Sequence, residues 1–268
     1  MKKSIITLLA LTLSLGLTAC GSSSTAEEST SEDGKTVVKV GVVGEYNAQW
    51  DTINELLADD GIEVELVKFT DYAAPNRALN DGEIDLNAFQ HKAFLANDIK
   101  QNGYEIESIG DTIIAPLSIY NNKDKISSVE EIKDGDIIAI PSDLTNGGRA
   151  LKLLEAAGLI ECDPAKGYVP TKADITKYNV QIEILEAESA TLANLLPDCT
   201  AALINGGNAF TAGLNPNEDA IFTEDINPET NAATPDLINV IAARSEDKDN
   251  EVYQKIVEAY HSEEVRQT

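Results

Sequence analysis

One segment of the chain gathers aromatic side chains at the end of a predicted strand. Residues 69–95 hold Tyr72, Phe89, His91 and Phe94. A lone aromatic residue usually belongs to a hydrophobic core, but four of them around two predicted helix starts favour the wall of a pocket. Asn87 is the predicted N-cap of a helix that begins at Phe89.

A second segment, residues 140–160, passes from a predicted strand through the pair Gly147-Gly148 into a predicted helix. Free backbone N–H groups and the helix dipole at such a start favour an anion. Arg149 is expected in the first helical turn, where a cation opposes the dipole, so it needs a reason such as pairing with a carboxylate. The alternative is a solvated surface arginine. A phosphate loop is disfavoured because its glycine spacing and its lysine-serine ending are missing.

A third group consists of two asparagines at predicted strands. Asn205 directly follows an apolar strand, and Asn239 lies inside another, between Ile238 and Val240. A buried amide must find hydrogen-bond partners. Each asparagine is therefore either a satisfied structural residue or a contact for a bound molecule.

The elements that must position these residues alternate along the chain. We expect strands at 36–44, 62–69, 136–141, 180–187, 200–205, 219–222 and 237–244, and helices at 48–58, 75–79, 89–101, 149–157, 189–196 and 249–260. This alternation predicts open α/β sheets. Two sheets are favoured over one very wide sheet, with the chain crossing in the apolar run 111–121 and returning in 227–239. Ligands then belong in the cleft between the two lobes.

The N-terminus predicts export and a lipid anchor. Two lysines, an apolar run from about Ile5 to Leu17 and small residues before Cys20 form the three parts of a secretory signal, residues 1–19. The run is too short to span a bilayer. Leu17-Thr18-Ala19-Cys20 also resembles the bacterial lipobox, in which the cysteine is lipidated; the alternative is an ordinary secreted protein.

Composition sets further limits on the function. Residues 20–35 contain no large apolar side chain, which predicts a flexible linker ahead of a folded body that begins near Thr36. The chain has 20 basic and 46 acidic residues and a net charge of −26. Such a body repels nucleic acid and anionic lipid, so nucleic acid is excluded as a partner.

Taken together, several stretches resemble the methionine-binding lipoprotein family, the NlpA-type solute-binding components of ABC importers. They are FTDYAAPNRAL, GEIDLNAFQHKAFL, IAIPSDLTNGGRALKLLEAAGLI, ALINGGNAFTAGL and INVIAAR, in the order and spacing of the family. The similarity runs over nearly the whole chain from about Val38. It depends on the combination, because no single stretch is specific.

The resemblance implies a two-lobed, periplasmic-binding-protein-like (type II) α/β fold with an amino acid enclosed between the lobes. One lobe would comprise 36–117 and 232–268, and the other 118–231. Arg149 would hold the ligand carboxylate, Asn205 and Asn239 would bind its backbone groups, and the four aromatic residues would enclose the thioether side chain. The resemblance further implies L-methionine as ligand, permease and ATPase subunits of an importer as partners, and the outer face of the cell membrane as location.

Four positions depart from the family pattern. Phe94 replaces a frequent tyrosine, Ser142 and Leu144 replace asparagine and proline, and Asn208 replaces a common aromatic residue. These departures do not affect the residues that would bind the carboxylate and the other backbone groups of the amino-acid ligand. They leave open whether the ligand is L-methionine, D-methionine, a methionine-containing dipeptide or another amino acid.

Other functional classes have weaker support in the sequence. A hydrolase is disfavoured because only His91 and His261 are present, without a nucleophile elbow or a zinc-binding helix, so neither an enzyme nor a cofactor is expected. An adhesin role stays open.

Residues 246–251 faintly resemble a calcium loop, but a solvated helix start is favoured. Cys162 and Cys199 are either a disulfide or two buried thiols.

Overall fold

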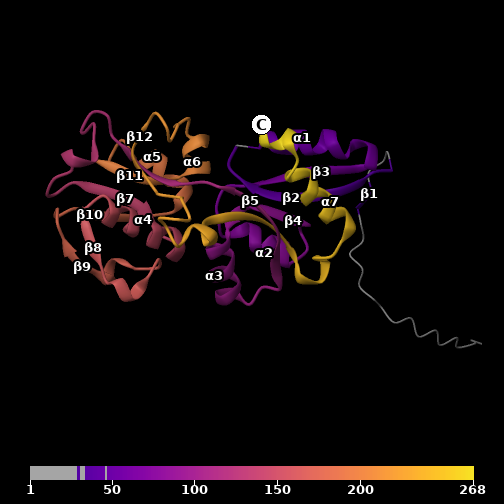
Figure 1. Cartoon of the computed structure of the whole chain (residues 1–268), viewed down its shortest axis with the longest axis horizontal. Helices are drawn as coiled ribbons and strands as arrows, with labels where there is room; N and C mark the ends of the chain where they lie inside the picture. Colours follow the sequence, from indigo (N-terminus) through magenta and orange to yellow (C-terminus); the bar gives the residue numbers. More distant parts are fainter. Residues whose placement is uncertain (1–28, 31–33, 46) are drawn as a thin grey trace, which may run out of the picture.

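The computed structural model describes residues 29–30, 34–45 and 47–268, which form two α/β lobes side by side (Figure 1). Each lobe is built around one β-sheet of its own, as predicted. The predicted signal peptide, Cys20 and most of the predicted linker lie outside the described residues. No helix in the described ranges has the length and hydropathy needed to cross a membrane.

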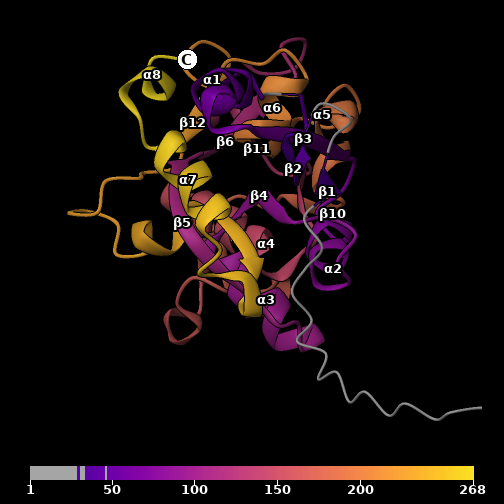
Figure 2. The ribbon, with the colours of Figure 1, turned by 90° about the vertical axis from the view of Figure 1, so that its right-hand side faces the viewer.

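The first lobe contains a six-stranded sheet in the order β1-β2-β4-β13-β5, with β3 paired to β2. Its strands are β1 (Ser29–Thr30), β2 (Thr36–Val43), β3 (Ile62–Phe69), β4 (Leu86–His91), β5 (Ile106–Ile114) and β13 (Ile238–Arg244). Its helices are α1 (Ala48–Leu57), α2 (Ala74–Asn80), α3 (Lys92–Asn102), α7 (Glu251–Tyr260) and α8 (Glu263–Arg266). Figure 2 shows α1 and α8 on one side of this sheet and α2 and α3 on the other.

The residues of β13 explain why both faces of this sheet are covered. Ile241 and Ala243 pack with α1 and α7, whereas Val240 and Ala242 pack with α2 and α3. Successive side chains of a strand point to opposite faces, so an uninterrupted apolar run requires a hydrophobic layer on each side. Asn239 is the polar exception that precedes this run.

The second lobe contains a five-stranded sheet in the order β10-β7-β11-β6-β12. Its strands are β6 (Leu117–Asn121), β7 (Ile137–Pro141), β10 (Glu183–Ala187), β11 (Ala201–Asn205) and β12 (Ala220–Thr223). Its helices are α4 (Leu144–Ala156) on one face and α5 (Leu192–Leu195) and α6 (Gly206–Thr211) on the other. A separate hairpin of β8 (Ile160–Cys162) and β9 (Ile175–Tyr178) was not predicted.

Short 3-10 helices complete the secondary structure. They span Ala58–Asp60, Val129–Glu131, Pro164–Lys166, Lys172–Asp174, Ser189–Thr191, Thr234–Leu237 and Ser245–Asp247. The segment that faintly resembled a calcium loop is a helix start, because the Asn250 side chain accepts hydrogen bonds from the first turn of α7.

The chain crosses between the two sheets twice. It leaves the first lobe between β5 and β6, at Ala115-Pro116, and returns between β12 and β13. The two crossings touch, because the Glu224 backbone N–H donates to the Leu117 carbonyl oxygen over 2.9 Å. The paired crossings therefore form one connection between the lobes.

The structure corrects several sequence-based expectations. Phe89 lies in β4 and the helix begins later, at Lys92, so the N-cap is His91 and the prediction for Asn87 is wrong. Asn87 is fully buried, and its side-chain amide donates a hydrogen bond to the Asn76 side chain of α2. Ser29 and Thr30 pair with β2, although they were expected to be unstructured linker.

The two cysteines of the folded body are free and buried. Cys162 packs in the core on the α4 side of the second sheet, whereas Cys199 packs on the α5 side. The sheet lies between them, so the structure contains two buried thiols and no disulfide at these positions. Burial raises the pKa of both thiols.

Candidate functional site

A cavity of about 300 Å³ lies between the lobes, beside the crossings. It is lined by all seven predicted site residues: Tyr72, Phe89, His91, Phe94, Arg149, Asn205 and Asn239. Sequence positions that lie far apart are thus brought to one place by the facing ends of the two sheets. Further lining residues were not predicted, among them Gln49 of α1 and Asn146 of α4.

The aromatic residues form one cluster on the first-lobe side of the cavity. The ring of Phe94 lies 6.0 Å from those of Tyr72 and Phe89 and 6.2 Å from that of His91, measured between centroids. The three contacts are edge-on, a favourable geometry for aromatic pairs. These rings give the cavity a rigid apolar wall.

His91 fixes the start of α3 and contacts the opposite lobe. Its Nδ1 accepts the Phe94 backbone N–H over 3.1 Å, so the ring proton resides on Nε2. Nε2 lies 3.2 Å from the Asn146 side-chain oxygen and donates to it. Burial, with a further contribution from the Arg149 charge, lowers the pKa of His91 to about 3. His91 is therefore a neutral donor at physiological pH.

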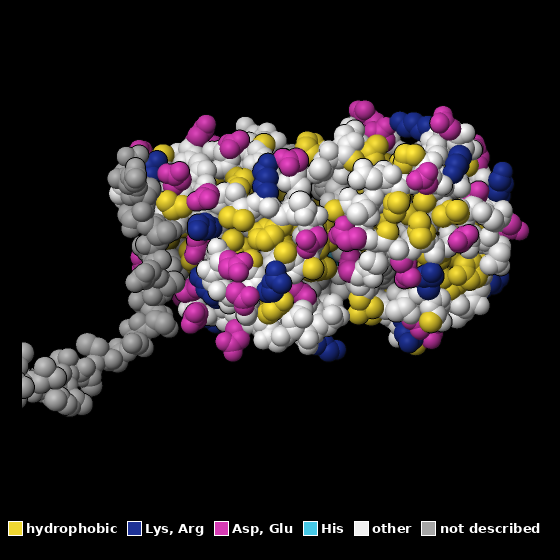
Figure 3. All heavy atoms as spheres, turned by 180° about the vertical axis from the view of Figure 1, so that it is seen from behind, with side chains coloured by type: hydrophobic (Ala, Val, Ile, Leu, Met, Phe, Trp, Pro, Cys, Tyr) yellow, Lys and Arg dark blue, Asp and Glu magenta, His cyan; other side chains and the backbone are white. Residues whose placement is uncertain are grey.

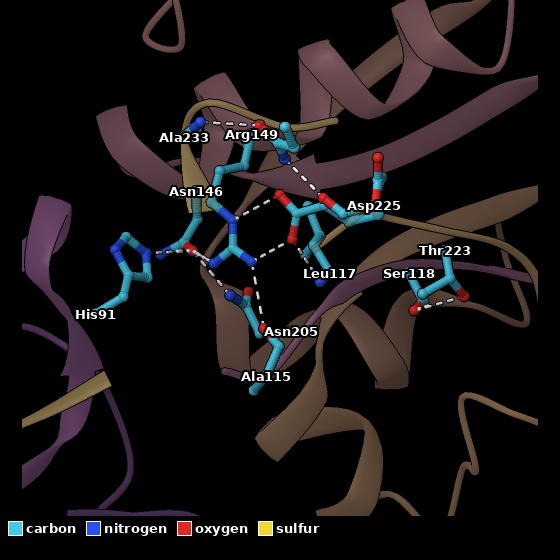
Figure 4. A network of polar contacts seen from close by, with 12 residues as sticks. His91, Ala115, Leu117, Ser118, Asn146, Arg149, Asn205, Thr223, Asp225 and Ala233 are labelled. Atoms are coloured by element: carbon cyan, nitrogen blue, oxygen red, sulfur yellow. Dashed lines mark hydrogen bonds and ion pairs between the residues drawn. The ribbon is translucent and has the colours of Figure 1, made fainter. Parts of the chain in front are cut away.

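Asn146 is the centre of the polar network in Figure 4. Its side-chain oxygen accepts from His91 in the first lobe and from Asn205 and Arg149 in the second, at 3.2, 2.8 and 3.4 Å. Its amide nitrogen donates to Asp143, which fixes the orientation of the amide group. No local sequence pattern indicates this role, because the partners of Asn146 come from distant elements.

Arg149 is buried and paired within the protein. Its side chain is 5% exposed, so the surface-arginine alternative is wrong. Nε donates to Glu224 over 3.1 Å, and Nη2 donates to the other oxygen of the same carboxylate and to the Ala115 carbonyl. Nη1 donates to Asn146. Since a guanidinium has five N–H donors, one Nη1 hydrogen remains for a ligand.

The N-terminus of α4 differs from its prediction. The helix begins at Leu144, so Arg149 lies in the second turn. The anion at the helix start is the Asp143 carboxylate, which accepts the Asn146 backbone N–H over 2.9 Å. The glycine pair serves close packing, because a Cβ on Gly147 would lie 2.9 Å from a backbone oxygen of β7. The expected anion site at this terminus is therefore occupied by the protein itself.

Several polar atoms at the cavity have no partner among the described residues. The side-chain oxygens of Asn205 and Gln49 are buried without a hydrogen bond. The Asn239 side chain makes none in the described part of the chain and lines the same cavity. A buried unpaired acceptor costs about 1–3 kcal/mol. The site therefore favours a ligand that brings N–H donors to these oxygens and an acceptor to Arg149.

The charge of the cavity is simple. Arg149 is the one charged side chain among its described lining residues, although acidic side chains are scattered over the face of the molecule shown in Figure 3. The described residues contain no cluster of three or more metal-ligating side chains. The arrangement therefore suits a small ligand with a carboxylate, an ammonium group and an apolar side chain.

The comparison with known proteins agrees with this geometry. A family model described as NlpA lipoprotein matches residues 38–268. The chain belongs to the NlpA lipoprotein family. The resemblance found in the sequence is thereby confirmed.

Relatives of known name and structure cover nearly the same length. The D-methionine-binding lipoprotein MetQ of Salmonella typhimurium is 39% identical over 260 residues, which cover 96% of this chain and 90% of the relative. A nutrient binding protein from Burkholderia cenocepacia, solved bound to methionine, is 36% identical with a TM-score of 0.79 and covers 86% of this chain and 94% of its own. The substrate binding protein of a methionine transporter from Streptococcus pneumoniae is 35% identical with a TM-score of 0.80, covering 87% and 91%. These structures share the two-lobed α/β fold predicted from the sequence.

Proposed function

We propose that this protein is an extracytoplasmic solute-binding lipoprotein that captures L-methionine, or a close derivative, and delivers it to an ABC importer. The observation that carries the proposal is the cavity between the lobes, which combines an aromatic wall with a single charged residue and unpaired amide oxygens. A relative named for binding D-methionine and a similar structure solved with methionine support methionine as the ligand. Binding and release, without catalysis, is the proposed activity.

The polar groups of the cavity suggest one orientation for the ligand. The carboxylate would accept the remaining Nη1 hydrogen of Arg149, and the ammonium group would donate to the unpaired oxygen of Asn205. The Asn239 amide, which lines the same cavity, would hydrogen-bond one of these two groups. Arg149 would hold the carboxylate through this single hydrogen, because its Nε and Nη2 already donate to Glu224.

The aromatic wall is proposed to receive the thioether side chain. A sulfur atom at the edge of an aromatic ring gains about 0.3–1.5 kcal/mol. A charged side chain placed there would be buried without a partner, because Tyr72, Phe89 and Phe94 offer at most one hydroxyl group, and that of Tyr72 already accepts from Asn208 over 3.0 Å. Aspartate and lysine are therefore poor candidates.

The membrane attachment is proposed from the sequence and the family. Residues 1–19 would be removed on export, Cys20 would carry the lipid, and 20–35 would link it to the body. The lobes would comprise 36–117 with 232–268, and 118–231. A body with this excess of acidic residues has no electrostatic attraction to anionic lipid, so the lipid would hold it at the membrane.

A thermal-shift measurement on ligand-free protein tests the proposed ligand. The soluble body is unfolded, dialysed and refolded to remove bound molecules, and its melting temperature is measured with L-methionine, aspartate or lysine. A ligand at a hundredfold excess over its Kd stabilises the folded state by about 2.7 kcal/mol. L-methionine should raise the melting temperature clearly and the charged amino acids should not. A shift by another amino acid but not by methionine would refute the ligand assignment.

A further inference from the structure

Glu224 approaches Arg149 from the side away from the proposed ligand. It follows β12 and lines a second cavity of about 500 Å³, which also borders Arg149 but does not include Asn205 or Asn239. The Glu224 side chain is 10% exposed. Arg149 thus separates the two cavities, with Glu224 on one side and the unpaired Asn205 oxygen and the Asn239 amide on the other.

The contacts of Glu224 hold it firmly in this place. One carboxylate oxygen accepts Arg149 Nε, and the other accepts Arg149 Nη2 and the Leu117 backbone N–H, which lies 3.1 Å away. Leu117 is the first residue of β6, directly after the crossing at Ala115-Pro116, and Glu224 begins the crossing that follows β12. The carboxylate therefore fixes the guanidinium relative to the connection of the lobes, and it cannot move aside without breaking these bonds.

The buried pair also determines the charge that a ligand meets. Arg149 is the one charged residue among the described residues lining the ligand cavity, and its direct partner cancels its charge. The nearby Asp143 carboxylate is bound by the start of α4. Burial raises the pKa of Tyr72 at this cavity, and the charges of Asp143 and Glu188 contribute to the rise. A buried charge is costly unless it is paired. A ligand carboxylate placed against a neutral Arg149–Glu224 pair must therefore bring its own positive charge.

We propose that Glu224 is a specificity-determining residue that restricts the site to ligands of zero net charge, by neutralising Arg149 from behind. The inference depends on the proposed amino-acid site and names the charge class of its ligand. Without Glu224, the uncompensated positive charge of Arg149 would bind a ligand that carries only a carboxylate. The ammonium group of an amino acid would then contribute less to the affinity.

The test compares two ligands that differ only in the ammonium group, L-methionine and 4-(methylthio)butanoate. Their Kd values are measured by titration calorimetry with the wild-type protein, Glu224→Gln and Glu224→Asp. Glu224→Gln should lower the ratio of the Kd of 4-(methylthio)butanoate to that of L-methionine by about tenfold, the size of one charge interaction in a partly buried site. Glu224→Asp keeps the charge and should keep the wild-type ratio. Glu161→Gln, which breaks an exposed ion pair with Lys177, is the matched control and should change neither Kd.

The ratio of the two Kd values distinguishes a role of Glu224 in specificity from a purely structural role. If Glu224→Gln weakens both ligands equally and leaves the ratio unchanged, Glu224 is only structural and the inference is overturned. Should Glu224→Gln not fold, the double variant Arg149→Gln/Glu224→Gln again has zero net charge, so it should retain discrimination while both ligands bind more weakly. Loss of discrimination in that variant would overturn the inference. Failure of the wild-type protein to bind L-methionine would instead refute the proposed function.

Discussion

Replacing Arg149 by methionine should destabilise the ligand-free protein as well as weaken ligand binding. Methionine fills most of the volume of the arginine side chain but donates no hydrogen bonds. The change removes both Arg149 contacts to Glu224, whose side chain is 10% exposed, and leaves that carboxylate with the Leu117 backbone N–H alone. An ion pair of this kind contributes little net stability while intact, but the loss of one partner leaves a buried charge without compensation.

The expected cost follows from this burial. Breaking a buried ion pair by removing one partner costs about 3–5 kcal/mol. Since a domain of 150–250 residues loses about 2–4 °C in Tm for each kcal/mol, Arg149→Met should lower the Tm by about 6–20 °C. The double variant Arg149→Met/Glu224→Gln removes the unpaired charge and should recover more than half of that loss. Lys177→Met is the matched control, because its partner Glu161 is 51% exposed and a surface pair contributes at most about 1 kcal/mol.

The assay is thermal unfolding of refolded, ligand-free protein, followed by circular dichroism. Ligand must be absent, since bound ligand would raise the stability of the wild-type protein and enlarge the apparent effect. If Arg149→Met melts within 2–3 °C of wild type (about 1 kcal/mol), or if the double variant is no more stable than the single one, the buried pair is not formed in solution. That result would also remove the basis for assigning Glu224 its role in specificity.

Three further predictions concern pH, hydrogen bonding and membrane attachment. His91 has a pKa of about 3 in the folded protein, below its unfolded value of about 6.5, so the unfolded chain takes up a proton between these values and stability should fall as the pH drops through this window. Between pH 7.5 and pH 5 the free energy of unfolding of the wild type should fall by about 2 kcal/mol more than that of His91→Asn. Asparagine is chosen because it keeps an N-cap acceptor for α3. Urea unfolding at the two pH values measures this difference, and an equal fall in both proteins would contradict the prediction. Tyr72→Phe removes the hydrogen bond that the hydroxyl accepts from Asn208 across the lobes, and should weaken L-methionine binding by about 0.5–1.5 kcal/mol in calorimetry; unchanged affinity would show that this bond does not contribute to closure. Cys20→Ser should move the protein from the membrane fraction to the soluble fraction without detergent, whereas retention equal to wild type would refute the lipid anchor.

The sequence predicted the fold where local patterns and long-range packing agree. The apolar run at Thr36 and the alternating segment at Ile62 form the expected strands β2 and β3, because each is rich in β-branched residues and is followed by a helical pattern. The predicted crossing in the run 111–121 is found at Ala115-Pro116, between β5 and β6. All seven predicted site residues line one cavity.

The features that were predicted wrongly or not at all depend on long-range contacts, which a local sequence pattern does not reveal. Phe89 and His91 lie in a strand because β4 pairs with β2 and β13, and this pairing overrides the helical appearance of the segment. Glu224 lies in a polar stretch without periodicity, and its role depends on Arg149, which is 75 residues away. Asn146 likewise depends on a partner in the other lobe. Such contacts follow from the closure of the two lobes rather than from any neighbouring residue.

The most direct test of the claim that this protein binds methionine is a competition among amino acids for the ligand-free protein. Refolded, ligand-free protein is mixed with equal amounts of the twenty common amino acids, desalted rapidly and denatured, and the released molecules are identified and counted by mass spectrometry. The proposed site predicts methionine at about one molecule per protein, with the others near background. Release of a different amino acid would contradict the ligand assignment, and an empty protein would contradict the enclosed amino-acid site itself.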